Sequence, residues 1–189
     1  MRPLTAGTIL AVVVGLTATE RPTFAQKQST GNLIQVMRGS VFRDANIVFD
    51  VQQADPGAPV KPGPSGEGAS TTARFANVYA GWQVVENAAV MLHESVDLML
   101  KPRLCANGIA APVGQADYRK AAEGLRGVAK DILKAAQARN RDQVIELAGS
   151  LSEACASCHQ IYRDPEGPKG FGDTSVRCKV PAARPSPGR

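Results

Sequence analysis

Hydrophobic residues recur at three- and four-residue steps in four segments of the chain, and stretches rich in proline and glycine separate these segments. We expect four helices, over about Asn32–Gln53, Thr71–Lys101, Gln115–Arg139 and Asp142–Arg163. The second is the clearest, because apolar residues keep the alternation from Phe75 to Met99. The pattern predicts an all-α protein, an antiparallel up-down four-helix bundle.

Composition agrees with a single helical domain. The chain has 189 residues, of which 43% are hydrophobic, enough for one core of its own. Only 5% are aromatic while alanine is abundant, which favours helices packed through small and aliphatic side chains over an aromatic-rich sandwich or barrel.

The first 25 residues have the pattern of a secretory signal peptide. Arg2 is followed by an apolar run over Thr8–Ala18, and small residues lead up to a cleavage site after Ala25. An uncleaved membrane anchor is the alternative, but the run is shorter than the ~20 residues that span a bilayer, and the charged Glu20 prevents its extension. We expect a mature periplasmic protein that is soluble and has no membrane segment.

Charge adds little to this picture. Removal of residues 1–25 lowers the formal net charge from +5 to +4, a mild excess that permits salt-sensitive association with acidic partners. The basic residues neither cluster densely nor alternate with aromatics, so we expect no nucleic-acid binding. The expected parts are a helical domain over residues 26–163 and a basic, proline- and glycine-containing tail over residues 164–189.

The four cysteines carry the candidate chemistry. Residues 155–159 have the sequence Cys-Ala-Ser-Cys-His, the C-x-x-C-H pattern of covalent haem attachment. On a helix, Cys155 and Cys158 lie on one face, so their thiols can add across the two vinyl groups of one porphyrin. The adjacent His159 then projects toward the iron. We therefore expect one covalently bound haem c.

Two other uses of this cysteine pair are open. A zinc site needs four protein ligands, and His93, Cys105 and Cys178 are scattered without a second paired motif. A thioredoxin-like redox pair needs a preceding strand and a helix N-terminus that lowers the thiol pKa, whereas this pair lies near the C-terminus of a predicted helix.

The run C-A-S-C-H-Q-I-Y-R in the last of four helices, in an exported chain, resembles the class II c-type cytochromes, the cytochrome c′ family and its low-spin relatives. The resemblance implies thioether bonds at Cys155 and Cys158, His159 as the proximal iron ligand, and Arg163 beside the haem. It also implies redox partner proteins and a homodimer formed through the first two helices. The long first connection, the two extra cysteines and the tail depart from the family pattern.

The sixth iron ligand is open between three alternatives. An up-down bundle places the start of the first helix and the end of the fourth at the same end, so Met37 lies at a depth similar to that of His159. Low-spin members of the family use a methionine near the start of the first helix, which the resemblance transfers to Met37. His93 also has a plausible depth, and cytochromes c′ leave this face of the iron open. A methionine on an apolar stripe can also be plain core filling.

The same topology places Cys105, after the second helix, and Cys178, after the fourth, at the haem end. We predict a disulfide between them, stabilising by roughly 2 to 4 kcal/mol. An intermolecular bridge or two free thiols are the alternatives.

Together these features predict a one-electron carrier with His/Met ligation. The alternative is a five-coordinate protein that binds nitric oxide or carbon monoxide. We expect no enzyme activity, because no acid and base groups converge near the predicted open face. A helical binding protein without haem is a further class.

Overall fold

The computed structural model of the chain describes residues 29–59, 71, 80–163 and 178. This part is helical and contains no strand, only an isolated bridge between Leu104 and Ala110. The predicted all-α class is therefore confirmed. The predicted signal peptide, residues 60–70 of the first connection, and all of the tail except Cys178 lie outside the described residues.

The first helix is built from three consecutive segments, α1 (Leu33–Val36), the π-helical η1 (Met37–Val41) and α2 (Phe42–Asp50). It begins with a capping box, in which the Asn32 side chain accepts from the Gln35 N–H at 3.0 Å and the Gln35 side chain accepts from the Asn32 N–H at 2.8 Å. The predicted helix over Asn32–Gln53 is thus present, with a π-helical turn that periodicity did not indicate.

The other three helices are α4 (Trp82–Leu100), α5 (Ala116–Gln137) and α6 (Arg141–Tyr162). The last two lie within a few residues of their predicted bounds. The prediction of an unbroken helix over 71–101 is wrong, because Gly81, just before α4, has a φ of 67°. A Cβ atom there would lie 2.8 Å from the Pro56 carbonyl oxygen, so this close approach requires glycine. Residues 72–79 lie outside the described part.

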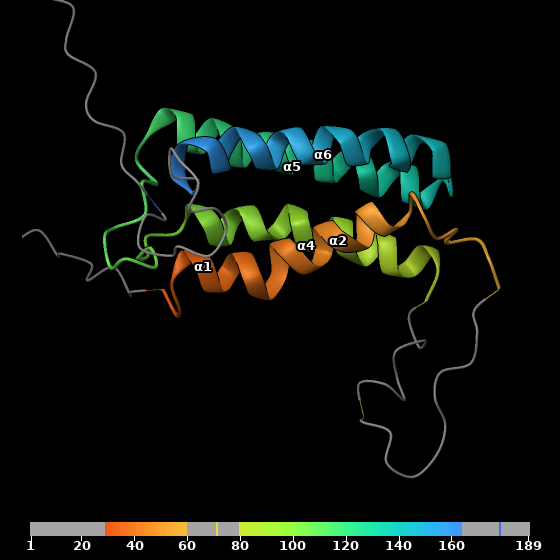
Figure 1. Ribbon diagram of the computed structural model, residues 1–189, viewed down its shortest axis with the longest axis horizontal. Helices are drawn as coiled ribbons and strands as arrows, with labels where there is room; N and C mark the ends of the chain where they lie inside the picture. The colour runs from red at the N-terminus through yellow and green to blue at the C-terminus, as the bar shows by residue number, and fades with distance from the viewer. Residues whose placement is uncertain (1–28, 60–70, 72–79, 164–177, 179–189) are drawn as a thin grey trace, which may run out of the picture.

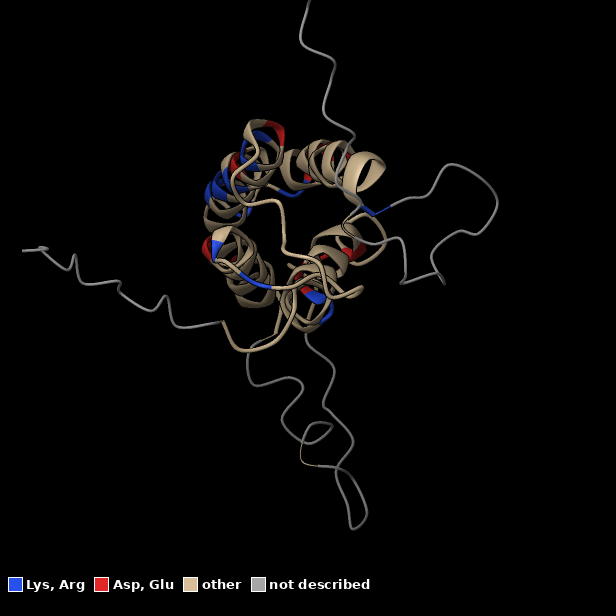
Figure 2. Cartoon of the chain, turned by 90° about the vertical axis from the view of Figure 1, so that its left-hand side faces the viewer, with Lys and Arg blue, Asp and Glu red and all other residues tan. Residues whose placement is uncertain are grey.

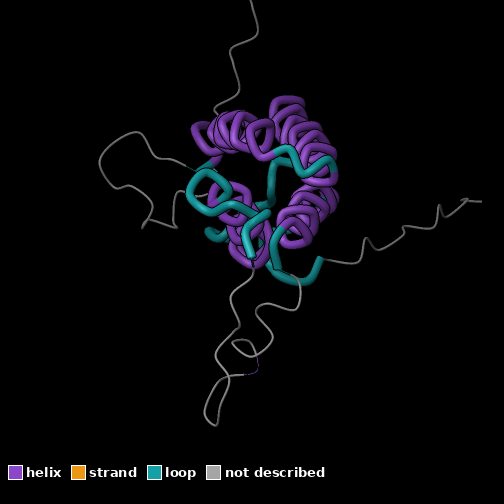
Figure 3. The backbone as a smooth tube through the Cα atoms, turned by 90° about the vertical axis from the view of Figure 1, so that its right-hand side faces the viewer, coloured by secondary structure: helices purple, strands orange, loops and turns teal. Residues whose placement is uncertain are grey.

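The helices pack lengthwise against one another (Figure 1). α5 lies between α4 and α6, and α2 contacts both α4 and α6. Seen along their axes, the helices surround a shared interior (Figure 3), and acidic and basic positions are interspersed along them (Figure 2). None of the helices in the described ranges has both the length and the apolar character needed to span a lipid bilayer.

Tyr118, near the start of α5, joins three helix ends. Its hydroxyl donates to the Met99 carbonyl oxygen at 3.2 Å, and its ring meets that of Tyr162 edge to face, with centroids 5.3 Å apart. The Leu33 N–H donates to the Leu104 carbonyl oxygen at 2.8 Å, which brings the start of the first helix to the same place. The start of the first helix, the end of α4, the start of α5 and the end of α6 therefore meet at one end of the described structure.

A disulfide joins Cys105 to Cys178 across 73 residues of sequence, with Cα atoms 5.6 Å apart. Both residues are buried, and the Cys178 N–H donates to the Tyr162 carbonyl oxygen. The predicted intramolecular pairing is confirmed, and it fixes Cys178 against the end of α6.

Candidate functional site

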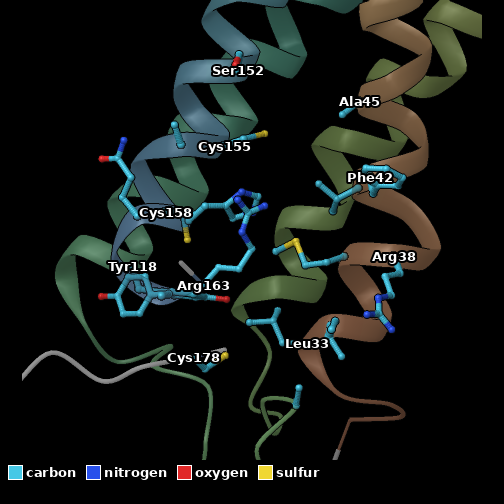
Figure 4. Close-up of a pocket in the computed structure, with 18 of the residues that line it drawn as sticks. Leu33, Arg38, Phe42, Ala45, Tyr118, Ser152, Cys155, Cys158, Arg163 and Cys178 are labelled. Carbon is cyan, nitrogen blue, oxygen red and sulfur yellow. The ribbon is translucent and has the colours of Figure 1, made fainter. Parts of the chain in front are cut away.

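A cavity of about 590 Å³ lies between the first helix and α6, at the end where Tyr118 joins the helices. This volume is within the range of roughly 300 to 1,000 Å³ that is usual for small-molecule and cofactor sites. Figure 4 shows Cys155 and Cys158 on one wall and Leu33, Arg38, Phe42 and Ala45 on the other. The lining is mainly apolar, so the cavity suits a large apolar ligand.

The α6 wall carries the whole predicted attachment motif. Cys155, Cys158 and His159 all line the cavity, and neither cysteine is disulfide-bonded. Their place follows from the apolar stripe of α6, in which Val144, Ala148, Leu151, Cys158 and Tyr162 are buried. Two thiols one helical turn apart and the adjacent imidazole thus face one space, as a porphyrin with two vinyl groups requires.

Burial raises the pKa of the Cys158 thiol to about 11, and the charge of a neighbouring Cys155 thiolate adds to this shift. Burial also raises the pKa of the Cys155 thiol, while Arg163 opposes both shifts. Reactive redox pairs show the opposite shift, because they depend on a stabilised thiolate. In the haem-free chain both thiols are therefore neutral at pH 7, unlike a thioredoxin-like pair.

Met37 lies on the opposite wall, in η1, partly buried and in contact with the hydrophobic core. His93 does not line the cavity: it is on α4, its side chain is 34% exposed, and its Nδ1 lies 3.1 Å from Glu94 Oε1. Of the two side chains considered as a second iron ligand, the structure therefore brings only Met37 to the cavity that holds His159.

Two arginines add positive charge to this mainly apolar lining. Arg163 follows the last residue of α6 and donates its backbone N–H to the His159 carbonyl oxygen at 2.9 Å. Arg38 lies on the first helix, next to Met37. Haem carries two carboxylates on one edge of an otherwise apolar macrocycle, and guanidinium groups are good carboxylate partners. The donor set, the apolar walls and these cations therefore suit haem.

A four-ligand zinc site receives no such support. Within the described ranges, no three or more His, Cys, Asp and Glu side chains are placed to hold a metal ion. Zinc sites of the structural kind need four such ligands, whereas a haem iron takes only its axial ligands from the protein.

Several residues of the cavity were not predicted from the sequence. Arg38 and Phe42 line it although both are exposed, and Phe42 is 67% exposed. Tyr118 lines it from α5. One sequence pattern could have indicated Arg38 and Phe42 as lining residues. The lining residues of the first helix come in adjacent pairs that recur every four residues: Leu33 and Ile34, Met37 and Arg38, Val41 and Phe42, Ala45 and Asn46.

Comparison with known proteins gives no relative for this chain: no family model, no curated protein and no solved structure matches it.

Proposed function

We propose that this chain is an exported class II c-type cytochrome, an antiparallel up-down four-helix bundle that carries single electrons in the periplasm. The observation that carries this proposal is the meeting of Cys155, Cys158 and His159 on one wall of an apolar cavity, with Met37 on the opposite wall. Haem bound there would supply an iron that exchanges one electron.

Six residues of the cavity have proposed tasks. Cys155 and Cys158 hold the porphyrin through thioether bonds, and His159 binds the iron from the α6 side. Met37 binds it from the first helix. The apolar walls exclude water from the iron and so influence its reduction potential. Arg38 and Arg163 balance the negative charge of the two haem carboxylates.

Covalent haem is tested on the full-length protein produced with a c-type haem attachment system. The mass of the mature chain should include one haem, and haem staining should survive denaturing electrophoresis. Changing both Cys155 and Cys158 to Ala should abolish the stain, whereas the matched variant Cys105→Ala/Cys178→Ala should keep it. A wild-type protein without covalent haem would refute the proposal in favour of a helical binding protein without haem.

The carrier function is tested at Met37. The wild-type spectrum should be low-spin, and Met37→Ala should make it high-spin and allow carbon monoxide to bind the reduced iron. His93→Ala is the control, because this residue lies outside the cavity. A high-spin wild type that binds carbon monoxide readily would favour the five-coordinate gas-binding alternative.

Redox partner proteins and a homodimer remain proposals based on the class II resemblance. Titration with acidic redox proteins at low and high salt tests the first, and sedimentation equilibrium tests the second.

A further inference from the structure

The first helix keeps one face toward the cavity over an unusual spacing. Its lining residues recur every four positions, from Leu33 through Met37, Val41 and Ala45 to Phe49. An α-helix turns about 100° per residue, so an unbroken one would rotate by about 160° between Leu33 and Phe49. A π-helical turn accommodates one extra residue and reduces this rotation to about 60°. The η1 turn therefore keeps these residues on one wall.

Met37 is the residue at which the winding changes. Its N–H donates to the Leu33 and Ile34 carbonyl oxygens, as in ordinary helix geometry, but its own carbonyl oxygen accepts from the Phe42 N–H five residues later. The direction of the Met37 side chain is thus coupled to the wide turn that begins there. In Figure 4, Arg38, Phe42 and Ala45 succeed one another along this wall.

Hydrogen bonds among three polar side chains, Ser40, Asp44 and Ser95, join the η1 turn to α4. Ser40, inside η1, donates to Asp44 Oδ2 at 3.0 Å, and its Oγ lies 2.7 Å from Ser95 Oγ on α4. Because a hydroxyl has one proton, Ser95 must be the donor in the second bond. Asp44 is 1% exposed and Ser95 is 0% exposed. The Arg43 guanidinium also binds the Asp44 carboxylate: its Nε and Nη2 each lie 3.1 Å from Oδ1.

These hydrogen bonds give a reason for the π-helical turn at this place. π-helical turns are rare, occur mostly as single turns inside α-helices, and are frequent at functional sites. Ser40 bonds both Asp44 and Ser95 from within the wide turn, so a change of register there would cost the buried Ser95 hydroxyl and Asp44 Oδ2 this shared partner.

We propose that Ser40, Asp44 and Ser95 are positioning residues, which fix the η1 turn in the register that presents Met37 to the haem iron. The proposal rests on the haem-binding function inferred above and extends it to three residues that do not line the cavity.

The test uses full-length, haem-loaded protein carrying Ser95→Ala or Asp44→Asn. Asp97→Asn is the matched control, since Asp97 is also on α4 but bonds Arg126 of α5, at 2.6 Å, in place of the first helix. We expect unchanged haem content, a partly high-spin spectrum, a shifted reduction potential and about tenfold faster carbon monoxide binding for the two test variants. The control should match the wild type.

The possible outcomes separate the two proposals. Variants that match the control in spin state, potential and carbon monoxide binding overturn the positioning role and leave the haem function intact. A haem-bearing wild type that is high-spin overturns the role as well, because Met37 would then not bind the iron. A wild type without haem refutes the function itself. If Asp44→Asn does not fold, Ser95→Ala alone tests the positioning role, because it removes only one hydroxyl group.

Discussion

The Cys105–Cys178 disulfide gives the most quantitative prediction. It joins positions 73 residues apart, so it restricts a large part of the unfolded chain. On the chain-entropy estimate, a loop of this size contributes about 4 kcal/mol to the free energy of unfolding. We expect the double variant Cys105→Ala/Cys178→Ala to lose about this amount, and its thermal midpoint to fall by about 10 °C.

The assay is urea unfolding of the wild type and the double variant, monitored by helical circular dichroism. Wild-type protein in reductant is the second arm, because the proposed thioether bonds to haem are not reduced and the disulfide opens. Since a reductant also reduces haem iron, the iron is held in the same oxidation state in both arms. Both arms should lose the same free energy. A loss below about 1 kcal/mol in both would refute the reasoning, since the cross-link would then barely constrain the unfolded state.

Two further predictions concern single side chains. The Asn140 side chain caps α6 by accepting from the Gln143 N–H at 3.1 Å. Asn140→Ala should therefore lower the free energy of unfolding by about 1 kcal/mol in urea, whereas Asn140→Asp, which keeps the acceptor, should not; equal losses would contradict the cap. The hydrogen bond and charge of Arg126 lower the pKa of Asp97 from its usual 3.8, so this pair contributes stability above pH 3.8 that is lost as pH falls through the folded-state pKa. NMR titration should place the Asp97 midpoint below 3.8 and return it toward 3.8 in Arg126→Gln; an unchanged midpoint would contradict the pairing.

Local sequence signals predicted those parts of the fold and site that depend on local structure. Helical periodicity predicted a helix over Gln115–Arg139, and α5 (Ala116–Gln137) lies within two residues of these bounds. The motif also predicted that Cys155, Cys158 and His159 face one space, because residues one helical turn apart lie on the same side of a helix.

Other features depend on contacts between distant segments. The break before α4 arises where Gly81 approaches Pro56, a contact that the sequence pattern does not report. The sequence did not predict the η1 turn, because apolar steps of three and four residues fit both an α-helix and a helix with a π-helical turn. The hydrogen bond from the Phe42 N–H to the Met37 carbonyl oxygen distinguishes the two. Ser40 and Ser95 meet only after the first helix packs on α4.

The two walls of the cavity come from the first and last helices of the described chain, which has a consequence for the order of assembly. α4, α5 and α6 follow one another in the sequence, whereas contact between the first helix and α6 joins the two ends of the helical part of the described chain. Contacts of such long sequence separation form late and slowly. A group attached to α6 would therefore face solvent during folding until the first helix docks, and the rate of docking would limit how soon the site matures.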